Sequence, residues 1–287
     1  MKLGKLCSIL SLIFISSNVM ADVAAKVPAK VPAKVPAKVL PAVETVSNPC
    51  SNSPEMLNIV NRPTVGDSVC TVPYLKTVVE LGYQYQDLTH SAGHAQNFPE
   101  AEFRLGLPWS SELVLVLPNY IHSTVPGYGF SATTVGIKHE LGFAKKWVAG
   151  AESLITLPNG SSAFGSRGYG IAVNGLLNYN YNPKINFSFM LGVTSETASV
   201  LNGGQRFTSI NPDIVATYSA GEKTNLYAEI YAQSKTAPNQ SSGSNVDAGI
   251  IYLLYPNMTV DFELGQRIYG QLAGINHYVG AGLAVMF

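Results

Sequence analysis

Residues 275–287 read INHYVGAGLAVMF and end on an aromatic side chain. Within this stretch an apolar side chain stands at every second position. A period of two predicts a β-strand whose two faces meet different surroundings. Because the end of a soluble domain is usually polar and poorly ordered, we interpret the stretch as a strand with one face in lipid. The lipid-facing residues of this interpretation are Val279, Ala281, Leu283, Val285 and Phe287.

The same alternation recurs from Lys76 onward. Residues 184–193, KINFSFMLGV, alternate apolar side chains with Asn, Ser and Gly, and residues 258–267, MTVDFELGQR, alternate them with Asp and Glu. We therefore expect an all-β protein, a transmembrane antiparallel up-and-down β-barrel of about twelve strands. The expected strands are 76–86, 98–107, 110–120, 129–141, 144–158, 169–181, 184–196, 207–219, 222–234, 244–255, 257–269 and 275–287.

The connections between these segments alternate in length. Long connections, such as DLTHSAGHAQN at 87–97 and SKTAPNQSSGSN at 234–245, alternate with short ones, such as NPK at 182–184. Outer-membrane barrels have short periplasmic turns and longer external loops. A soluble β-sandwich shares the period of two but does not require this alternation of connections, so the pattern favours the membrane barrel.

The first residues, MKLGKLCSILSLIFISSNVMA at 1–21, combine two lysines, an apolar run and a small-residue end. This order is typical of a secretory signal peptide, and we expect cleavage after Ala21. Charged residues make up 13% of the chain, against about 25% in soluble domains. An exported chain that is poor in charge and has no long apolar run after its signal fits the bacterial outer membrane.

Residues 22–49 contain a repeat of Ala-Lys-Val-Pro. Proline at every fourth position excludes a helix, so we expect an extended, disordered tether. A solvated linker explains this repeat. The alternative is that Lys26, Lys30, Lys34 and Lys38 attract an anionic partner such as the cell wall.

Residues 50–75 are expected to form a periplasmic segment or a plug, and residues 76–287 the barrel. Cys50 and Cys70 are the cysteines expected after removal of the signal, and export favours a disulfide between them. Two thiols with no His nearby do not complete a metal site. We therefore expect neither a metal nor a cofactor.

The parity of each strand predicts which side chains face the lumen. Carboxylates facing lipid would be costly, so the charged residues belong inside. Most are acidic, and two interpretations stay open: they pair with the basic side chains and fill the barrel, or they line a polar path that disfavours anions. The candidates are Glu80, Glu100, Glu102, Arg104, Glu112, Lys138, Glu140, Glu152, Asp213, Glu229, Asp247, Asp261, Glu263 and Arg267.

Several ordered stretches resemble a family of outer-membrane barrels described as phenol meta-pathway degradation proteins or transporters. They include FRLGLPWSSELVLVLP at 103–118, GYGFSATTVGIKHEL at 127–141 and DAGIIYLLYPNMTVDFELG at 247–265. The resemblance covers about 76–287, although SATTVG at 131–136 replaces a Gly-Asp pair usual in the family. It implies a barrel that admits small solutes, including aromatic or other apolar ones. The terminal Phe287 likewise resembles the signal that such barrels present to the barrel-assembly machinery.

The sequence leaves two functions open: passive uptake of a small solute, or a non-conducting barrel that anchors the envelope or mediates adhesion. A lipid-face hydrolase would need a Ser and a His together near the outer rim. His139 has the right parity but lies near the periplasmic end, and His277 has no Ser in register. We therefore expect no catalytic residues. The expected partners are outer-membrane lipid, the assembly machinery and a small solute, and a formal net charge of +0 gives no attraction to nucleic acid.

Overall fold

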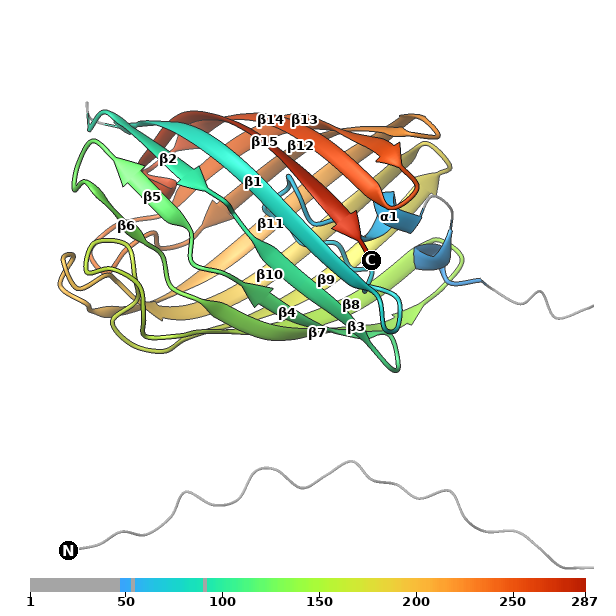
Figure 1. Ribbon diagram of the computed structural model, residues 1–287, viewed down its shortest axis with the longest axis horizontal. Coiled ribbons are helices and arrows are strands. Elements are labelled where there is room, and N and C mark those ends of the chain that lie inside the picture. The colour runs from blue at the N-terminus through green and yellow to red at the C-terminus, as the bar shows by residue number, and fades with distance from the viewer. Residues whose placement is uncertain (1–46, 53–54, 90–91) are drawn as a thin grey trace, which may run out of the picture. The chain divides into compact units, whose positions relative to one another are not determined.

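The computed structural model describes residues 47–52, 55–89 and 92–287. The expected signal peptide and residues 22–46 of the expected tether lie outside this part of the chain. One antiparallel sheet closes on itself, because β15 (Ile275–Met286) pairs with β1 (Thr77–Leu88) as well as with β14 (Met258–Tyr269). Figure 1 shows the resulting barrel. The expected closed barrel of twelve antiparallel strands is confirmed.

The wall of the barrel has twelve strand positions, and nine consecutive positions are each formed by one uninterrupted strand. They agree with the expected segments to within a few residues, and several extend further at their ends. The strands are β1, β8 (Trp147–Thr156), β9 (Gly170–Asn182), β10 (Ile185–Thr197), β11 (Arg206–Gly221), β12 (Thr224–Gln233), β13 (Gly243–Tyr255), β14 (Met258–Tyr269) and β15.

Each of the other three positions is formed by two shorter strands. They are β2 (His94–Phe98) with β3 (Glu102–Leu107), β4 (Ser111–Val116) with β5 (Tyr120–Ser123), and β6 (Tyr128–Phe130) with β7 (Thr134–Phe143). Proline lacks a backbone donor, which accounts for the breaks at Pro99 and Pro118. The breaks stay in register, since Leu117 N donates to Ala101 O at 2.9 Å and Ser131 N donates to Asn119 O at 2.9 Å.

The exposed and buried faces of the strands follow the alternation in the sequence. On β14, Phe262 and Leu264 are 48% and 54% exposed, whereas Asp261 and Glu263 are 7% and 2% exposed. A wall with an apolar outside and a charged inside is the arrangement of a barrel in lipid. In the described part of the chain, no helix is long and apolar enough to cross a membrane.

The connections place two different rims on the barrel. Two-residue turns such as 183–184, 222–223 and 256–257 lie at one rim, and the long connections lie at the other. The long connections are shorter than the sequence suggested, because β2 and β5 continue into the ranges expected to be loops. The rim with short turns is the periplasmic rim of an outer-membrane barrel.

Candidate functional site: the lumen and the segment within it

Residues 47–52 and 55–75 precede the barrel in sequence, and much of this stretch lies against its inner wall; we call these residues the inner segment. A disulfide joins Cys50 to Cys70, as expected, and α1 (Glu55–Ile59) lies between them. Met56 and Ile59 of this helix are buried. They belong to an apolar cluster with inward side chains of the wall, among them Val148, Leu176 and Ile251. Burial of apolar area therefore holds the inner segment in the barrel.

Glu80 on β1 is the first polar anchor of the inner segment. Its carboxylate accepts hydrogen bonds from Asn61 N at 3.0 Å and Arg62 N at 2.7 Å. Arg104 on β3 donates to the same carboxylate at 2.6 Å, and both of these side chains are fully buried. Arg104 also donates to the carbonyl oxygen of Ile59. A buried acid is thus satisfied jointly by the wall and by the segment, as a buried charge requires.

Arg62 reaches from the inner segment to the seam where the barrel closes. Its Nη1 lies 2.7 Å from Glu100 Oε2, and its Nη2 lies 3.3 Å from Asp261 Oδ1. Burial would lower the pKa of Arg62, but the charges of Asp261, Glu100 and Glu263 raise it above its ordinary value. The guanidinium therefore stays protonated and offsets part of the acidity of the wall.

Glu229 on β12 anchors the middle of the inner segment. It accepts hydrogen bonds from Val65 N at 3.1 Å and Gly66 N at 2.8 Å. On the opposite wall, Glu112 of β4 accepts from Val72 N at 2.6 Å. The segment therefore spans the lumen between two carboxylates of different strands.

Lys138 on β7 completes this network. Its Nζ lies 2.9 Å from Glu112 Oε1 and donates to Ser68 O at 2.8 Å. Glu140 on the same strand accepts from the backbone and the hydroxyl of Thr71 at 2.9 and 3.0 Å. Both wall and segment supply donors, so the inward acids are not left without partners on this side.

The structure places the sequence candidates at different depths. Ten are 7% exposed or less: Glu80, Arg104, Glu112, Lys138, Glu152, Asp213, Glu229, Asp247, Asp261 and Glu263. Glu102 is partly buried, 3.8 Å from Arg104, and Arg267 near the external rim is also partly buried.

The acids of β12, β13 and β14 are brought together, but their pairings differ. Glu229 and Asp247 are direct cross-strand partners. Asp261 and Glu263 instead lie beside Arg62, at 3.3 and 4.0 Å. Arg267 is a hydrogen-bond donor to Gly270 O at 3.3 Å rather than a partner of these acids. Of the acids on these three strands, those that Arg62 does not offset are therefore Glu229 on β12 and Asp247 on β13.

The residues expected to form an assembly signal lie on the outer face of the last strand. Val279, Ala281 and Phe287 are exposed, and Leu283 and Val285 are half-buried. Phe287 exchanges backbone hydrogen bonds with Thr77, at 2.8 and 3.3 Å, and so forms the last link of the closed sheet. Their role as a signal stays a prediction.

Sequence reasoning missed Asn61 and Arg62, which no motif distinguishes. An excess of inward acids over inward bases was the available signal, because buried carboxylates need donors from another part of the chain. It also missed that Ser111 Oγ and His139 Nδ1 lie 2.9 Å apart on the outer face. Among the described residues no carboxylate is hydrogen-bonded to His139, so the orienting group of a hydrolytic triad is not found there.

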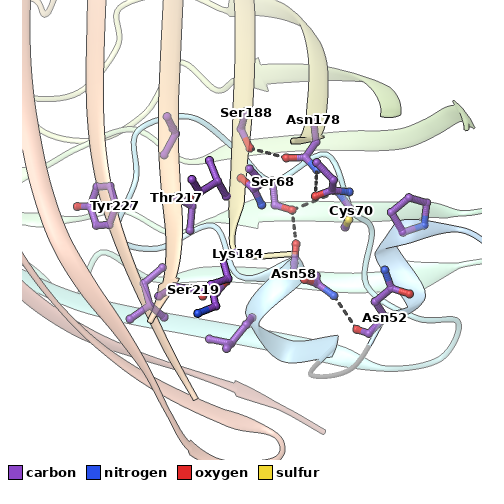
Figure 2. A pocket seen from close by; sticks show the side chains of 18 of the residues that line it. Asn52, Asn58, Ser68, Cys70, Asn178, Lys184, Ser188, Thr217, Ser219 and Tyr227 are labelled. Atoms are coloured by element: carbon purple, nitrogen blue, oxygen red, sulfur yellow. Dashed lines mark hydrogen bonds between the residues drawn. The ribbon is translucent and has the colours of Figure 1, made fainter. Parts of the chain in front are cut away.

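A cavity of about 820 Å³ remains between the inner segment and the wall of β9–β12. Figure 2 shows Thr217, Ser219 and Tyr227 on one side and Asn52 and Asn58 of the inner segment on the other. The cavity extends to Lys184 and the other short turns. A second cavity of about 570 Å³ lies at the rim of long loops, against β10, β11 and the loop 236–240.

Comparisons with known proteins agree with this architecture. A family model described as "Putative MetA-pathway of phenol degradation" matches residues 61–287. The fold is similar to that of the COG4313 outer membrane channel from Pseudomonas putida F1, at 12% identity and a TM-score of 0.63, over 78% of this chain and 100% of that one. It is also similar to the NanC porin, at 12% identity and a TM-score of 0.50, over 74% and 99% of the two chains. A search of curated sequences finds no match. Barrels of this kind belong to the bacterial outer membrane.

Proposed function

Because the chain belongs to the family described as "Putative MetA-pathway of phenol degradation", matched over residues 61–287, we propose that it is a channel for passive passage of small solutes. The inner segment acts as a partial plug of the periplasmic half of the lumen. Solutes pass between this segment and the wall of β9–β12. Uptake of aromatic solutes is supported only by the family description, and catalysis is no part of the proposal.

The observation that carries the proposal is the position of the two cavities. One opens among the short turns and the other among the long loops, and both border β10 and β11. The anchors Glu80, Arg104, Glu112 and Lys138 lie on β1, β3, β4 and β7. Several anchors of the inner segment are therefore on one side of the lumen; on the side of β9–β12 it is held through Glu229, and we place the path beside this contact.

The charges beside this path favour cations. Asp213, Glu229 and Asp247 are buried on adjacent strands β11, β12 and β13, and no described Lys or Arg forms a salt bridge with them. A narrow passage between walls of low dielectric concentrates the field of such charges. Anions are then disfavoured at the middle of the barrel.

One observation favours the second candidate, a non-conducting barrel that anchors the envelope or mediates adhesion. Several buried carboxylates hold the inner segment and a disulfide cross-links it internally, so a plug that stays in place would close the lumen. The two candidates differ in whether ions cross the barrel with the segment in place.

Single-channel recording in planar bilayers tests this directly. We expect the complete protein to conduct with cation preference, measured as the reversal potential under a salt gradient. Arg62→Met, which removes the anchor at the seam, should raise the conductance. If neither protein conducts, although the different gel migration of boiled and unboiled samples shows that both are folded, the structural or adhesive role is the better account.

A further inference from the structure

Four side chains form a continuous row across the wall of the larger cavity. Asn180 of β9 is the direct partner of Asn186 of β10, which is the partner of Thr217 of β11, which is the partner of Tyr227 of β12. All four border the cavity, and we call them the polar row. The row presents two amides and two hydroxyls at one level, with no charged group among them.

Two atoms of the polar row are buried without a hydrogen-bond partner among the described residues: Asn186 Oδ1 and Tyr227 Oη. Tyr227 is 4% exposed. A buried polar atom without a partner costs free energy, so such atoms at a cavity indicate groups that a ligand or water satisfies. An amide oxygen accepts a hydrogen bond, and a phenol hydroxyl both donates and accepts.

The ring of Tyr227 is held in place by the neighbouring strand. Its partner on β13 is Gly249, where an added Cβ would lie 2.6 Å from Tyr227 Cε1. Glycine is therefore required for the ring to lie this close to the backbone. This packing fixes the hydroxyl at the end of the polar row.

The opposite side of the cavity, on the inner segment, is mixed. Its apolar part is Leu57, Val60 and Val69, and beside them the cavity is bordered by Asn52, Asn58, Thr64, Asp67 and Ser68. The charged lining residues apart from Asp67 are at the short turns, as Lys145, Lys146, Lys184 and Glu222. A ligand between the two sides meets hydrogen-bonding groups on the wall, and on the inner segment a hydrocarbon patch flanked by further polar groups. This combination suits an uncharged ring with hydroxyls at its edge.

We propose that the polar row and the apolar part of the inner segment, Leu57, Val60 and Val69, form a binding site for an uncharged, polyhydroxylated solute of the size of a hexose. Amide and hydroxyl groups can match hydroxyls that both donate and accept, whereas the polar row offers a charged solute no partner charge in exchange for its lost hydration. The site deepens the proposed function by naming a substrate class. Binding from the periplasmic side requires no conduction, so the two proposals can fail separately.

Saturation-transfer NMR on the complete protein in detergent tests the site, with glucose, gluconate, glucosamine and phenol as probes. Glucose and the two charged probes are similar in size and differ in charge. We expect transfer to glucose and little to gluconate or glucosamine. Tyr227→Phe and Asn186→Leu should each weaken glucose binding about threefold to tenfold, the effect of one lost hydrogen bond.

Tyr252→Phe is the matched control, because it removes the same hydroxyl from the exposed outer face of β13. It should leave glucose binding unchanged. Equal transfer to glucose in the wild type and in Tyr227→Phe, or a preference for phenol over glucose, would overturn the proposal. Binding of glucose by a protein that passes no current would support the site and count against the channel.

Discussion

Gly82 and Gly282 are direct cross-strand partners at the seam between β1 and β15, and the guanidinium of Arg62 covers both. An added Cβ at Gly82 would lie 2.2 Å from Arg62 Cζ, and one at Gly282 would lie 2.3 Å from Arg62 Nε. Because the two glycines have no side chains, they leave space at the seam for the guanidinium of Arg62, the one cationic side chain of the inner segment. Asp261 and Glu100 then fix its direction.

Gly82→Ala should displace Arg62 and lower the free energy of unfolding by about 1–3 kcal/mol, because its carboxylate partners remain buried. Guanidinium chloride titration of the detergent-solubilised barrel measures the change. Gly142→Ala is the control, since an added Cβ there meets nothing within 4 Å. Equal stability of the two variants would show that Arg62 adapts without loss.

Arg62→Met should raise single-channel conductance and shift the reversal potential further toward cations. The change removes a positive charge beside Asp261 and Glu263 and frees the inner segment at the seam. Arg206→Met is the control, because Arg206 is exposed and bonded to Ser195 and Tyr169 near the loops. A similar effect of both variants would point to general charge rather than to the anchor.

Asp213→Asn combined with Asp247→Asn should weaken the preference for cations and leave the conductance similar. These acids are buried beside Glu229, but unlike Glu229 they accept no hydrogen bond from the described backbone of the inner segment. The reversal potential under a salt gradient measures the effect. Asp87→Asn, at a residue that borders neither cavity, should change it far less. An unchanged value in the double variant would reject the acidic path.

Removal of the disulfide, by Cys50→Ser with Cys70→Ser, should loosen the base of the inner segment. A cross-link that closes a loop of this length is worth about 3 kcal/mol in the chain-entropy model. We expect faster proteolysis between residues 47 and 75 and noisier single-channel currents, while the barrel still migrates as folded. Proteolysis at the wild-type rate would show that the carboxylate anchors suffice.

Phe287→Ala should slow insertion into lipid vesicles in the presence of the assembly machinery, if the terminal residue is recognised. Phe262→Ala removes the same side chain from the outer face of β14 and serves as the control. Gel migration of unboiled samples over time gives the folded fraction. Equal delays in both variants would indicate lost apolar area rather than a signal.

The strands and their closure were predictable, because side chains that alternate between lipid and the barrel interior leave little freedom in the register of neighbouring strands. Asp261 and Glu263 were placed inward by parity alone. The breaks at Pro99 and Pro118, which divide strands expected to be continuous, were not predicted. The course of the inner segment was not predictable either, since Asn61 and Arg62 make contacts with strands that are distant in sequence and follow no local pattern.

The anchors of the inner segment also bear on the order of folding. Arg62 and Asp261 are 199 residues apart in sequence, and Gly66 and Glu229 are 163 residues apart. Contacts over such separations form late, because a long loop must close before they are made. Arg62 is translated before every strand it binds. The space beside Gly82 and Gly282 that holds its guanidinium is complete only when β1 pairs with β15. The guanidinium of Arg62 therefore lacks its full set of contacts until the seam has formed around it.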